Sequence, residues 1–152
     1  MTKVEKVTGD LLTFMGTVKN RFFRPMELVA RNRLSPTQFH TLTLLYRRSS
    51  LPMSELAGYL KISKQQLTPL VAKMAECGLL ERKLDETDRR MVRLEITEAG
   101  RDTYRSVFSE MRRKLIDQLG LLPEESLDEL ENLLGRLNLI LFQNSQGGRE
   151  NG

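Results

Sequence analysis

The sequence predicts a mainly α-helical protein with one small β-hairpin, an α+β fold, in a chain of 152 residues. Three observations support this prediction. Apolar residues recur three and four positions apart over most of the chain, which is typical of amphipathic helices. Two short helical segments meet at a tight turn between residues 54 and 77. Directly after them, two short segments of β-forming residues flank a polar run, which predicts a hairpin.

The first predicted helix carries the apolar stripe Val4, Val7, Leu11, Phe14 and Val18, and we expect it to end near Arg24-Pro25 or slightly beyond. The next helix begins at Ser35-Pro36-Thr37-Gln38, where Ser35 and Gln38 form a capping box around a proline at the first helical position. Leu51-Pro52-Met53 is too short for more than a token strand. Ser54 is then expected to cap a third helix over residues 55–60.

A turn at Lys61-Ile62 leads to a second capping box, formed by Ser63 and Gln66, and to a helix from Lys64 to Glu76 or Cys77. Gly78 is a natural stop for that helix. Residues 79–83 and 91–96 predict the paired strands of the hairpin. Thr97 is expected to cap a helix to about residue 119, and Pro123 to open a last helix to about residue 144. The polar tail, 145–152, is expected to be disordered.

We therefore expect a single domain over residues 1–152, with a winged helix-turn-helix over 35–97. Helices over 3–30 and 98–144 flank it. Charge is distributed unevenly along this plan. Eight basic and five acidic residues lie in 61–93, whereas six acidic residues and one arginine lie in 115–142. This separation is expected of a protein that docks on phosphates in one orientation, although a solvated surface without such a role is the alternative.

Composition argues against several other classes of protein. The chain has one histidine, His40, and one cysteine, Cys77, so we expect no disulfide, no metal and no cofactor, and we expect Cys77 to be buried. The usual combinations of nucleophile and base have too few members for us to expect an enzyme. No apolar run approaches the roughly 20 residues of a membrane-spanning helix. We expect a cytoplasmic location without membrane association.

The helix that starts at Lys64 has two distinct faces at 100° per residue. Its core face is predicted to hold Leu67, Leu70, Val71 and Met74, and its outward face Gln65, Thr68, Pro69 and Ala72. A short polar face of this kind can enter a DNA major groove, where glutamine pairs with adenine and threonine meets a thymine methyl group. Pro69 removes an amide donor and can kink the helix. An ordinary surface helix is the alternative.

The tip of the hairpin reads Asp85-Glu86-Thr87-Asp88-Arg89-Arg90. Arginines at the end of a projecting ribbon can insert into a narrow, electronegative minor groove. Asp88 can hold a neighbouring arginine by a bidentate contact. The alternative is that these charges only solubilise a turn.

Together these segments resemble the multiple-antibiotic-resistance regulator (MarR) family of winged helix-turn-helix transcription factors. The resemblance lies in Ser54-Glu55-Leu56-Ala57, in the segment from Ile62-Ser63 to Gly78-Leu79-Leu80, and in the hairpin tip followed by Leu94-Glu95-Ile96-Thr97-Glu98-Ala99-Gly100. It implies a double-stranded DNA partner, contacted by the helix residues Ser63, Lys64, Gln65, Gln66, Thr68 and Lys73. It also implies that Arg90, beside Arg89, reaches the minor groove and that Asp88 supports the wing.

The same resemblance implies a small aromatic or phenolic effector, for which the sequence assigns no ligand-binding residues. The candidate aromatic lining residues are Phe14, Phe22, Phe23, Phe39, His40, Tyr46 and Phe108, each of which is more readily explained as core. The segment Leu67-Thr68-Pro69-Leu70 is similar to the branch that senses organic hydroperoxides. That branch relies on a cysteine near the N-terminus, which this chain lacks, so we do not expect peroxide sensing by that route.

The last predicted helix carries an a/d heptad seam, formed by Leu127, Leu130, Leu134, Leu137 and Leu141. The first helix has the same rhythm at Val4, Val7 and Leu11. Either stripe alone is typical of plain core, but two matched seams outside the helix-turn-helix favour a homodimer interface. A two-fold dimer would act on a pseudo-palindromic operator. We therefore predict a ligand-responsive repressor; the alternative is a winged-helix protein-docking module without specific DNA binding.

Overall fold

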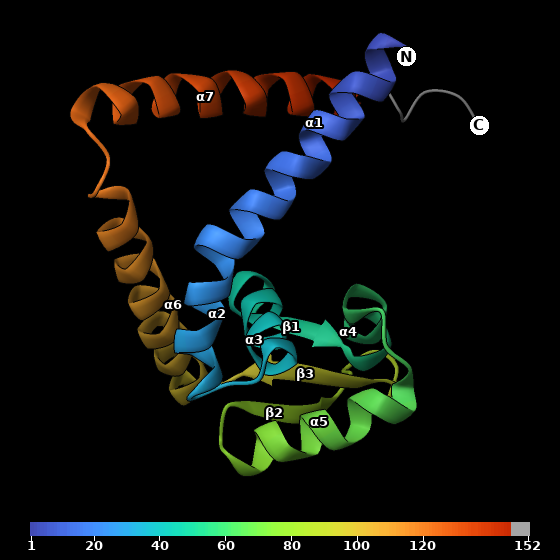
Figure 1. Ribbon diagram of the computed structural model, residues 1–152. Helices are drawn as coiled ribbons and strands as arrows, with labels where there is room; N and C mark the ends of the chain where they lie inside the picture. The colour runs from blue at the N-terminus through green and yellow to red at the C-terminus, as the bar shows by residue number, and fades with distance from the viewer. Residues whose placement is uncertain (147–152) are drawn as a thin grey trace. The chain divides into compact units, whose positions relative to one another are not determined.

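The computed structural model describes residues 1–146 and shows a mainly helical chain with a small three-stranded sheet, which confirms the predicted fold class (Figure 1). The described chain divides into two units, Met1–Lys114 and the part from Leu115 onward. The elements are α1 (Lys3–Val18), η1 (Lys19–Phe23), α2 (Arg24–Arg31), α3 (Pro36–Arg48), β1 (Ser50–Pro52), α4 (Met53–Leu60), α5 (Lys64–Glu76), β2 (Leu80–Leu84), β3 (Val92–Ile96), α6 (Glu98–Leu119) and α7 (Glu124–Gln146). Of the predicted tail, 145–152, only Ser145 and Gln146 lie within the described residues, and both belong to α7.

The hydrophobic core of the first unit is built by α3, α4, α5, α6 and the sheet. Its fully buried large side chains are Leu42, Leu45, Leu56, Leu67, Val71, Met74, Leu80, Leu94 and Val107. Residues from helices and strands far apart in sequence thus share one apolar interior, whose burial is the main favourable term in folding. The predicted core face of α5 is confirmed at its three fully buried positions, and Leu70 is half-buried.

The sheet has the order β1-β3-β2, and both pairings are antiparallel. Leu94 in the middle strand lies opposite Leu51 of β1 and Arg82 of β2. The token strand that the sequence allowed before α4 is present as β1, one residue earlier than expected, and it pairs with β3 over three residues. Because β3 is paired on both edges, the hairpin formed by β2 and β3 is anchored to the helical core.

The expectation that Ser54 caps α4 is wrong. The helix begins one residue earlier, at Met53, and its N-cap position is held by Pro52 without a side-chain cap. Pro52 has extended backbone geometry (φ −59°, ψ 143°) and belongs to β1, so the strand continues directly into the helix. The turn that follows is closed by Lys61 in the left-handed conformation (φ 53°), and its amide donates to the Gly58 carbonyl at 3.2 Å.

Both predicted capping boxes are present. Ser35 with Gln38 caps α3, and Ser63 with Gln66 caps α5, and in each pair the backbone amide of either residue donates to the side chain of the other. After α5, Gly78 adopts a positive φ of 71°, as expected where a helix ends and the chain turns into a strand. The Thr97 hydroxyl accepts a hydrogen bond from the Gly100 amide at 2.9 Å and so caps α6 as predicted.

The first helical path is less regular than predicted. It runs through α1, the π-helical η1 and α2 to Arg31, beyond Pro25 and close to the end expected at residue 30. In η1 the helix widens, and the Arg24 amide donates to the Lys19 carbonyl five residues back. This wider turn precedes Pro25, which lacks an amide hydrogen and stands in the first turn of α2. The path therefore continues through a proline that would otherwise end it.

Gly100 is required by close packing between α6 and the turn before β2. A Cβ atom at this position would overlap the carbonyl oxygen of Leu79, which accepts a hydrogen bond from the Thr97 amide at 3.2 Å. Because the obstacle is backbone, it cannot move aside as a flexible side chain would. The close approach holds the start of α6 against the hairpin.

We predict that Gly100→Ala lowers the free energy of unfolding by about 1–3 kcal/mol, because an added methyl group overpacks this contact. Urea denaturation followed by circular dichroism measures the change. Gly58→Ala is the matched control, since a Cβ atom there meets nothing within 4 Å in α4, and we expect it to stabilise by roughly 0.5–1 kcal/mol. Equal effects of the two substitutions would contradict this account of Gly100.

Candidate nucleic-acid interface

Helix α5 presents a polar face opposite its buried one. Gln65, Thr68, Pro69 and Lys73 are exposed, whereas Leu67 on the other side is fully buried. The helix is continuous through Pro69. These predicted groove-facing residues therefore lie on one accessible surface of the first unit.

Two polar side chains of α5 are committed to the helix itself. The Gln66 Oε1 atom accepts from the Ser63 amide at 3.0 Å, and the Gln66 amide donates to Ser63 Oγ at 3.2 Å. The Thr68 hydroxyl donates to the Lys64 carbonyl at 2.9 Å. The structure thus places the predicted DNA-contacting residues together and gives Ser63 and Gln66 a structural function that limits how their side chains can turn.

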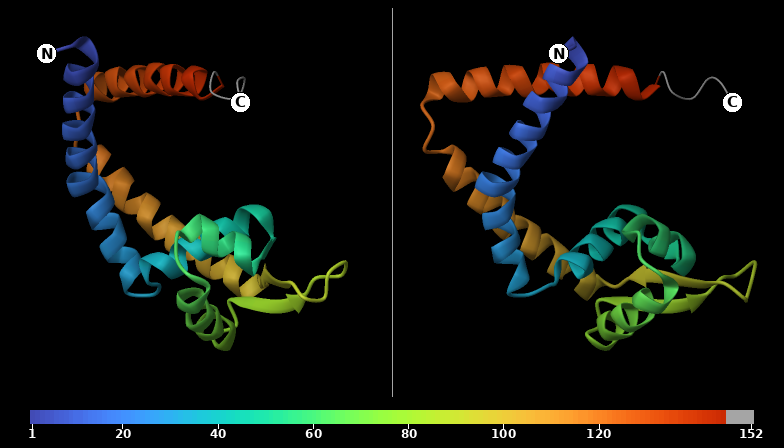
Figure 2. Two further views of the ribbon diagram at one scale, coloured as in Figure 1. Left: turned by 90° about the vertical axis from the view of Figure 1, so that its right-hand side faces the viewer. Right: turned by 45° about the vertical axis from the view of Figure 1, so that its right-hand side comes forward.

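The hairpin projects beyond the helices of the first unit (Figure 2). Its tip is closed by two backbone hydrogen bonds, from the Asp85 amide to the Met91 carbonyl and from the Met91 amide to the Asp88 carbonyl, each 2.9 Å long. Arg89 and Arg90 lie on this tip and are exposed. Their guanidinium groups are therefore carried outward by a closed loop.

The carboxylate of Asp85 organises the tip. It accepts hydrogen bonds from the Thr87 hydroxyl at 2.6 Å, from the Thr87 amide at 2.9 Å and from the Asp88 amide at 3.0 Å. It also accepts from Arg93 Nη1 at 3.3 Å. The Thr87 hydroxyl, followed by the two amides and Arg93, holds the pKa of Asp85 well below its ordinary value. The ionised form of the Asp85 carboxyl group is therefore the form that stabilises the loop.

Arg93 links the hairpin to β1. Its Nε atom donates to Ser50 Oγ at 2.9 Å, while Nη1 reaches Asp85. The sequence proposed Asp88 as the carboxylate that holds an arginine side chain, and this is wrong. Asp88 instead accepts from the backbone amide of Arg90 at 3.0 Å, in a short local turn. The Asp85–Arg93 pair was missed because its members lie in a loop and a strand, eight residues apart, without a recognisable spacing.

Charges on the outer face of the hairpin are also paired. Lys83 Nζ lies 2.6 Å from the Glu95 carboxylate and 3.9 Å from that of Glu81. The hydrogen bond to Glu95 raises the pKa of Lys83. Because these groups neutralise one another, they add little positive charge to this face of the hairpin.

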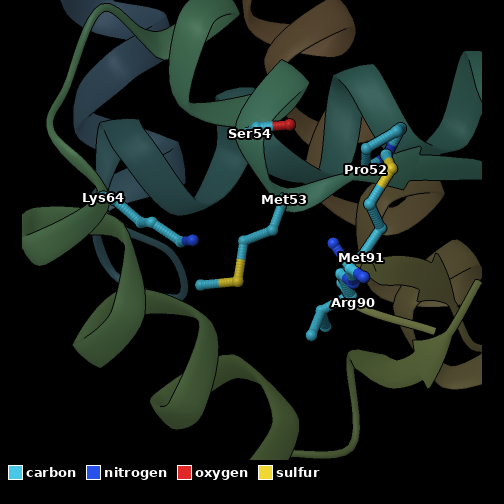
Figure 3. A pocket seen from close by; sticks show the side chains of 7 residues that line it. Pro52, Met53, Ser54, Lys64, Arg90 and Met91 are labelled. Carbon is cyan, nitrogen blue, oxygen red and sulfur yellow. The ribbon is translucent and has the colours of Figure 1, made fainter. Parts of the chain in front are cut away.

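The N-terminus of α5 and the hairpin border the same hollow, which has a volume of about 240 Å³. In Figure 3, Lys64 approaches it from α5 and Arg90 from the hairpin. The other lining residues are Pro52, Met53, Ser54, Met91 and Val92. Two cations from segments 26 residues apart in sequence are thus brought to one side of the molecule, as a ligand with closely spaced phosphates requires.

The terminal helices leave their apolar seams exposed in the single chain. Helix α1 has no buried residue, and the exposed fractions of Val4, Val7 and Leu11 are 74%, 52% and 40%. On α7, Leu134 and Leu141 are 45% and 51% exposed. The remaining seam residues, Leu127, Leu130 and Leu137, are half-buried. These stripes are not core of either unit.

In residues 1–146, no helix combines the length and apolarity needed to cross a bilayer.

The candidate effector-lining aromatic residues fall into separate groups. Phe39, Tyr46 and Phe108 surround Tyr104, with ring centroids 5.6, 4.4 and 5.8 Å from it. Phe14 and Phe23 instead line an apolar hollow of about 330 Å³ beside η1.

His40 is exposed, and the described residues contain no group of side chains suited to a metal ion. Cys77 is exposed, so the expectation of a buried cysteine is wrong.

Comparison with known proteins agrees with this geometry. A family model described as the MarR family matches residues 34–92. The chain is 28% identical over 111 residues to the HTH-type transcriptional regulator MhqR of Bacillus subtilis, covering 73% of this chain and 77% of that one. It is 26% identical over 142 residues to the organic hydroperoxide resistance transcriptional regulator of the same species, covering 91% and 90%.

Residues 34–92 form a MarR-family domain. The fold agrees with that assignment: the transcriptional regulator Tm0710 of Thermotoga maritima superimposes with a TM-score of 0.75 at 24% identity, covering 93% of this chain and 98% of that one. MarR-family proteins are DNA-binding transcriptional regulators, not enzymes, and are typically dimers. The chain is accordingly a DNA-binding regulator.

We predict that Asp85→Ala weakens DNA binding on the order of tenfold, because the tip must then be ordered when DNA binds. Fluorescence anisotropy with a DNA duplex selected by the wild-type protein measures the affinity. Hydrogen exchange at the Thr87 and Asp88 amides should accelerate in the same variant. Glu86→Ala, which removes the neighbouring exposed carboxylate, is the control: it should leave the hydrogen exchange unchanged and should not weaken DNA binding.

The pH dependence of the tip follows from the lowered pKa of Asp85. A carboxylate with a lower pKa in the folded state contributes fully above its unfolded pKa of about 3.9, and the contribution is lost as the pH falls toward the folded value. Protection of the Thr87 amide, corrected for intrinsic exchange, should therefore stay constant from about pH 8 to pH 5. A loss of protection near neutral pH would contradict the assigned function of Asp85.

Proposed function

We propose that this protein is a homodimeric, ligand-responsive repressor that binds a pseudo-palindromic DNA operator. The observation that carries the proposal is the shared surface of α5 and the hairpin tip, where Lys64 and Arg90 border one hollow. A helix in the major groove and a ribbon tip at the adjacent minor groove would contact phosphates on both sides. Arg90 reaches the minor groove, and the exposed face of α5 enters the major groove.

The residue assignments follow from this docking. Ser63, Lys64, Gln65, Gln66, Thr68 and Lys73 form the α5 contribution, and Asp88, Arg89 and Arg90 form the wing. Asp85 and Arg93 join them as positioning residues, since they hold the tip against β1. Specific binding therefore depends on groups that touch DNA and on groups that only orient them.

A homodimer is supported by the exposed seams of α1 and α7. Apolar stripes of this length are costly to leave in water, and a second copy presents the same stripes with two-fold symmetry. Two copies would present two α5 helices to successive major grooves, which requires a pseudo-palindromic site. The interface residues are Val4, Val7, Leu11, Leu127, Leu130, Leu134, Leu137 and Leu141.

Repression and effector response complete the proposal. Occupation of an operator that overlaps a promoter excludes the polymerase sterically, so the DNA-binding surface is sufficient for repression. A small aromatic or phenolic effector is supported by the apolar hollow beside η1, where Phe14 and Phe23 are about half exposed. Its target being cellular DNA, we place the protein in the cytoplasm.

We predict that Arg90→Ala weakens binding to the selected operator by about 1–3 kcal/mol, because a minor-groove guanidinium is lost. Fluorescence anisotropy at several salt concentrations measures both the affinity and its salt dependence. Arg112→Ala, which removes an equal charge from the exposed surface of α6, is the matched control.

Equal affinity of wild type and Arg90→Ala would refute the wing assignment. Binding that does not weaken steeply as salt is added would favour the protein-docking alternative, since contacts with phosphates release counterions. The two results are separable because the first concerns one residue and the second the whole interface.

We predict that the double variant Val7→Asp, Leu134→Asp is a folded monomer, its dimer dissociation constant raised at least about a hundredfold because carboxylates would be buried without partners. Both positions are exposed in the single chain, so the protomer itself should be unaffected. Sedimentation velocity measures the oligomer and circular dichroism the fold. Asn132→Asp, on α7 but opposite the heptad seam, is the control. A folded dimer with both aspartates would overturn the interface.

A further inference from the structure

Beyond Gln65, the exposed α5 face is apolar at its centre, although its edges are charged. Thr68, Pro69 and Ala72 lie three and four residues apart, so they form one short strip along the helix. Thr68 and Pro69 are exposed and Ala72 is half-buried. Lys64 and Lys73 flank the strip toward the two ends of the helix and are exposed.

Hydrogen bonding removes polar character from the same strip. The Thr68 hydroxyl turns back to the Lys64 carbonyl, 2.9 Å away, so its proton is used within the helix and is not offered to a base, while its γ-methyl group belongs to an exposed side chain. Pro69 has no amide hydrogen, and its ring carbons are what it presents to solvent. Ala72 adds a methyl group. The strip therefore offers carbon where a helix that reads hydrogen-bonding patterns would offer donors.

Only one base edge in the major groove matches an apolar strip. Guanine, cytosine and adenine present donors and acceptors there, whereas thymine adds a C5 methyl group. Flanking lysines match the phosphates on either side of the groove. An unpaired donor or acceptor of another base buried against Pro69 would lose its hydrogen bond to water, which disfavours those bases.

We propose that Thr68, Pro69 and Ala72 read thymine methyl groups in the major groove, so that each half-site contains thymine opposite this strip. This inference rests on the proposed function, because it takes α5 as the helix that enters the groove. It gives Pro69 a recognition function. The proline ring removes one hydrogen bond from the helix and adds apolar surface at the base edges.

Deoxyuridine provides the test, because it differs from thymidine in the major groove only by the missing methyl group. A duplex is first selected by the full-length protein from a random library and then synthesised with deoxyuridine at one thymidine position at a time. At one or two positions in each half-site, wild-type affinity should fall about fourfold for each methyl group removed. Fluorescence anisotropy measures each dissociation constant.

Two variants assign that loss to the strip. Thr68→Ser keeps the hydroxyl group and deletes the methyl group, while Pro69→Ala restores the helix hydrogen bond and deletes the ring. Each should bind the selected duplex more weakly than wild type and should no longer distinguish deoxyuridine from thymidine at its own position. Lys73→Ala is the control, since losing a flanking charge should weaken binding to both duplexes equally.

The possible results separate this inference from the proposed function. Specific binding that is insensitive to deoxyuridine at every position overturns the methyl recognition and leaves the DNA-binding function intact. A loss that persists unchanged in both variants also overturns it, because another residue then contacts the methyl group. Failure of the protein to select any sequence would instead contradict the proposed function itself.

Discussion

Strand β3 is the constraint on which the DNA-binding half of this molecule depends. It is paired on both edges, so its register fixes β1 and β2 at once. On one face Leu94 is fully buried in the core, while on the other Arg93 reaches Ser50 and Asp85. A shift of one residue would exchange these faces, placing a guanidinium in the core and removing the partner of the tip carboxylate. Hydrophobic burial thereby sets the position of a loop that contributes little to the core itself.

The same core orients α5 without using its outward residues. Leu67, Val71 and Met74 are fully buried against the sheet and neighbouring helices, so the rotation of α5 about its axis is fixed from behind. The capping box adds a defined first turn. The side chains at the outward positions are then free to differ in chemistry at little cost in stability. Pro69 does cost the helix one hydrogen bond, and burial of the opposite face offsets that loss. In the proposed DNA complex, one face of α5 would hold the fold together and the other would determine the sequence preference.

Most features that depend on neighbouring residues or on helical periodicity were predictable from the sequence, whereas features that depend on strand register were not. The capping boxes and the stop at Gly78 arise from contacts within one turn, and the buried face of α5 follows from the spacing of its apolar residues. The cap of α4 is the local exception, since β1 runs directly into that helix and displaces the expected Ser54 cap. Strand β1 has only three residues and becomes a strand because β3 offers a free edge. The Asp85–Arg93 pair likewise exists only once β2 and β3 are aligned. The π-helical turn before Pro25 shifts the periodicity by one residue, which an apolar stripe does not reveal.

In the proposed dimer, binding to DNA and pairing of the two protomers depend on different forces, because basic and acidic residues are concentrated in different parts of the chain. Residues 61–93 carry eight basic and five acidic side chains, whereas 115–142 carry six acidic side chains and one arginine. DNA binding draws on attraction to phosphate, which salt weakens. Pairing of two acidic α7 helices works against their own repulsion, so its stability must come from the exposed leucines, and salt relieves the repulsion. An acidic dimerisation region also disfavours docking on DNA through the wrong surface. In the proposed dimer, the arrangement of charge would therefore select the orientation on DNA, and burial of leucine would supply the affinity between protomers.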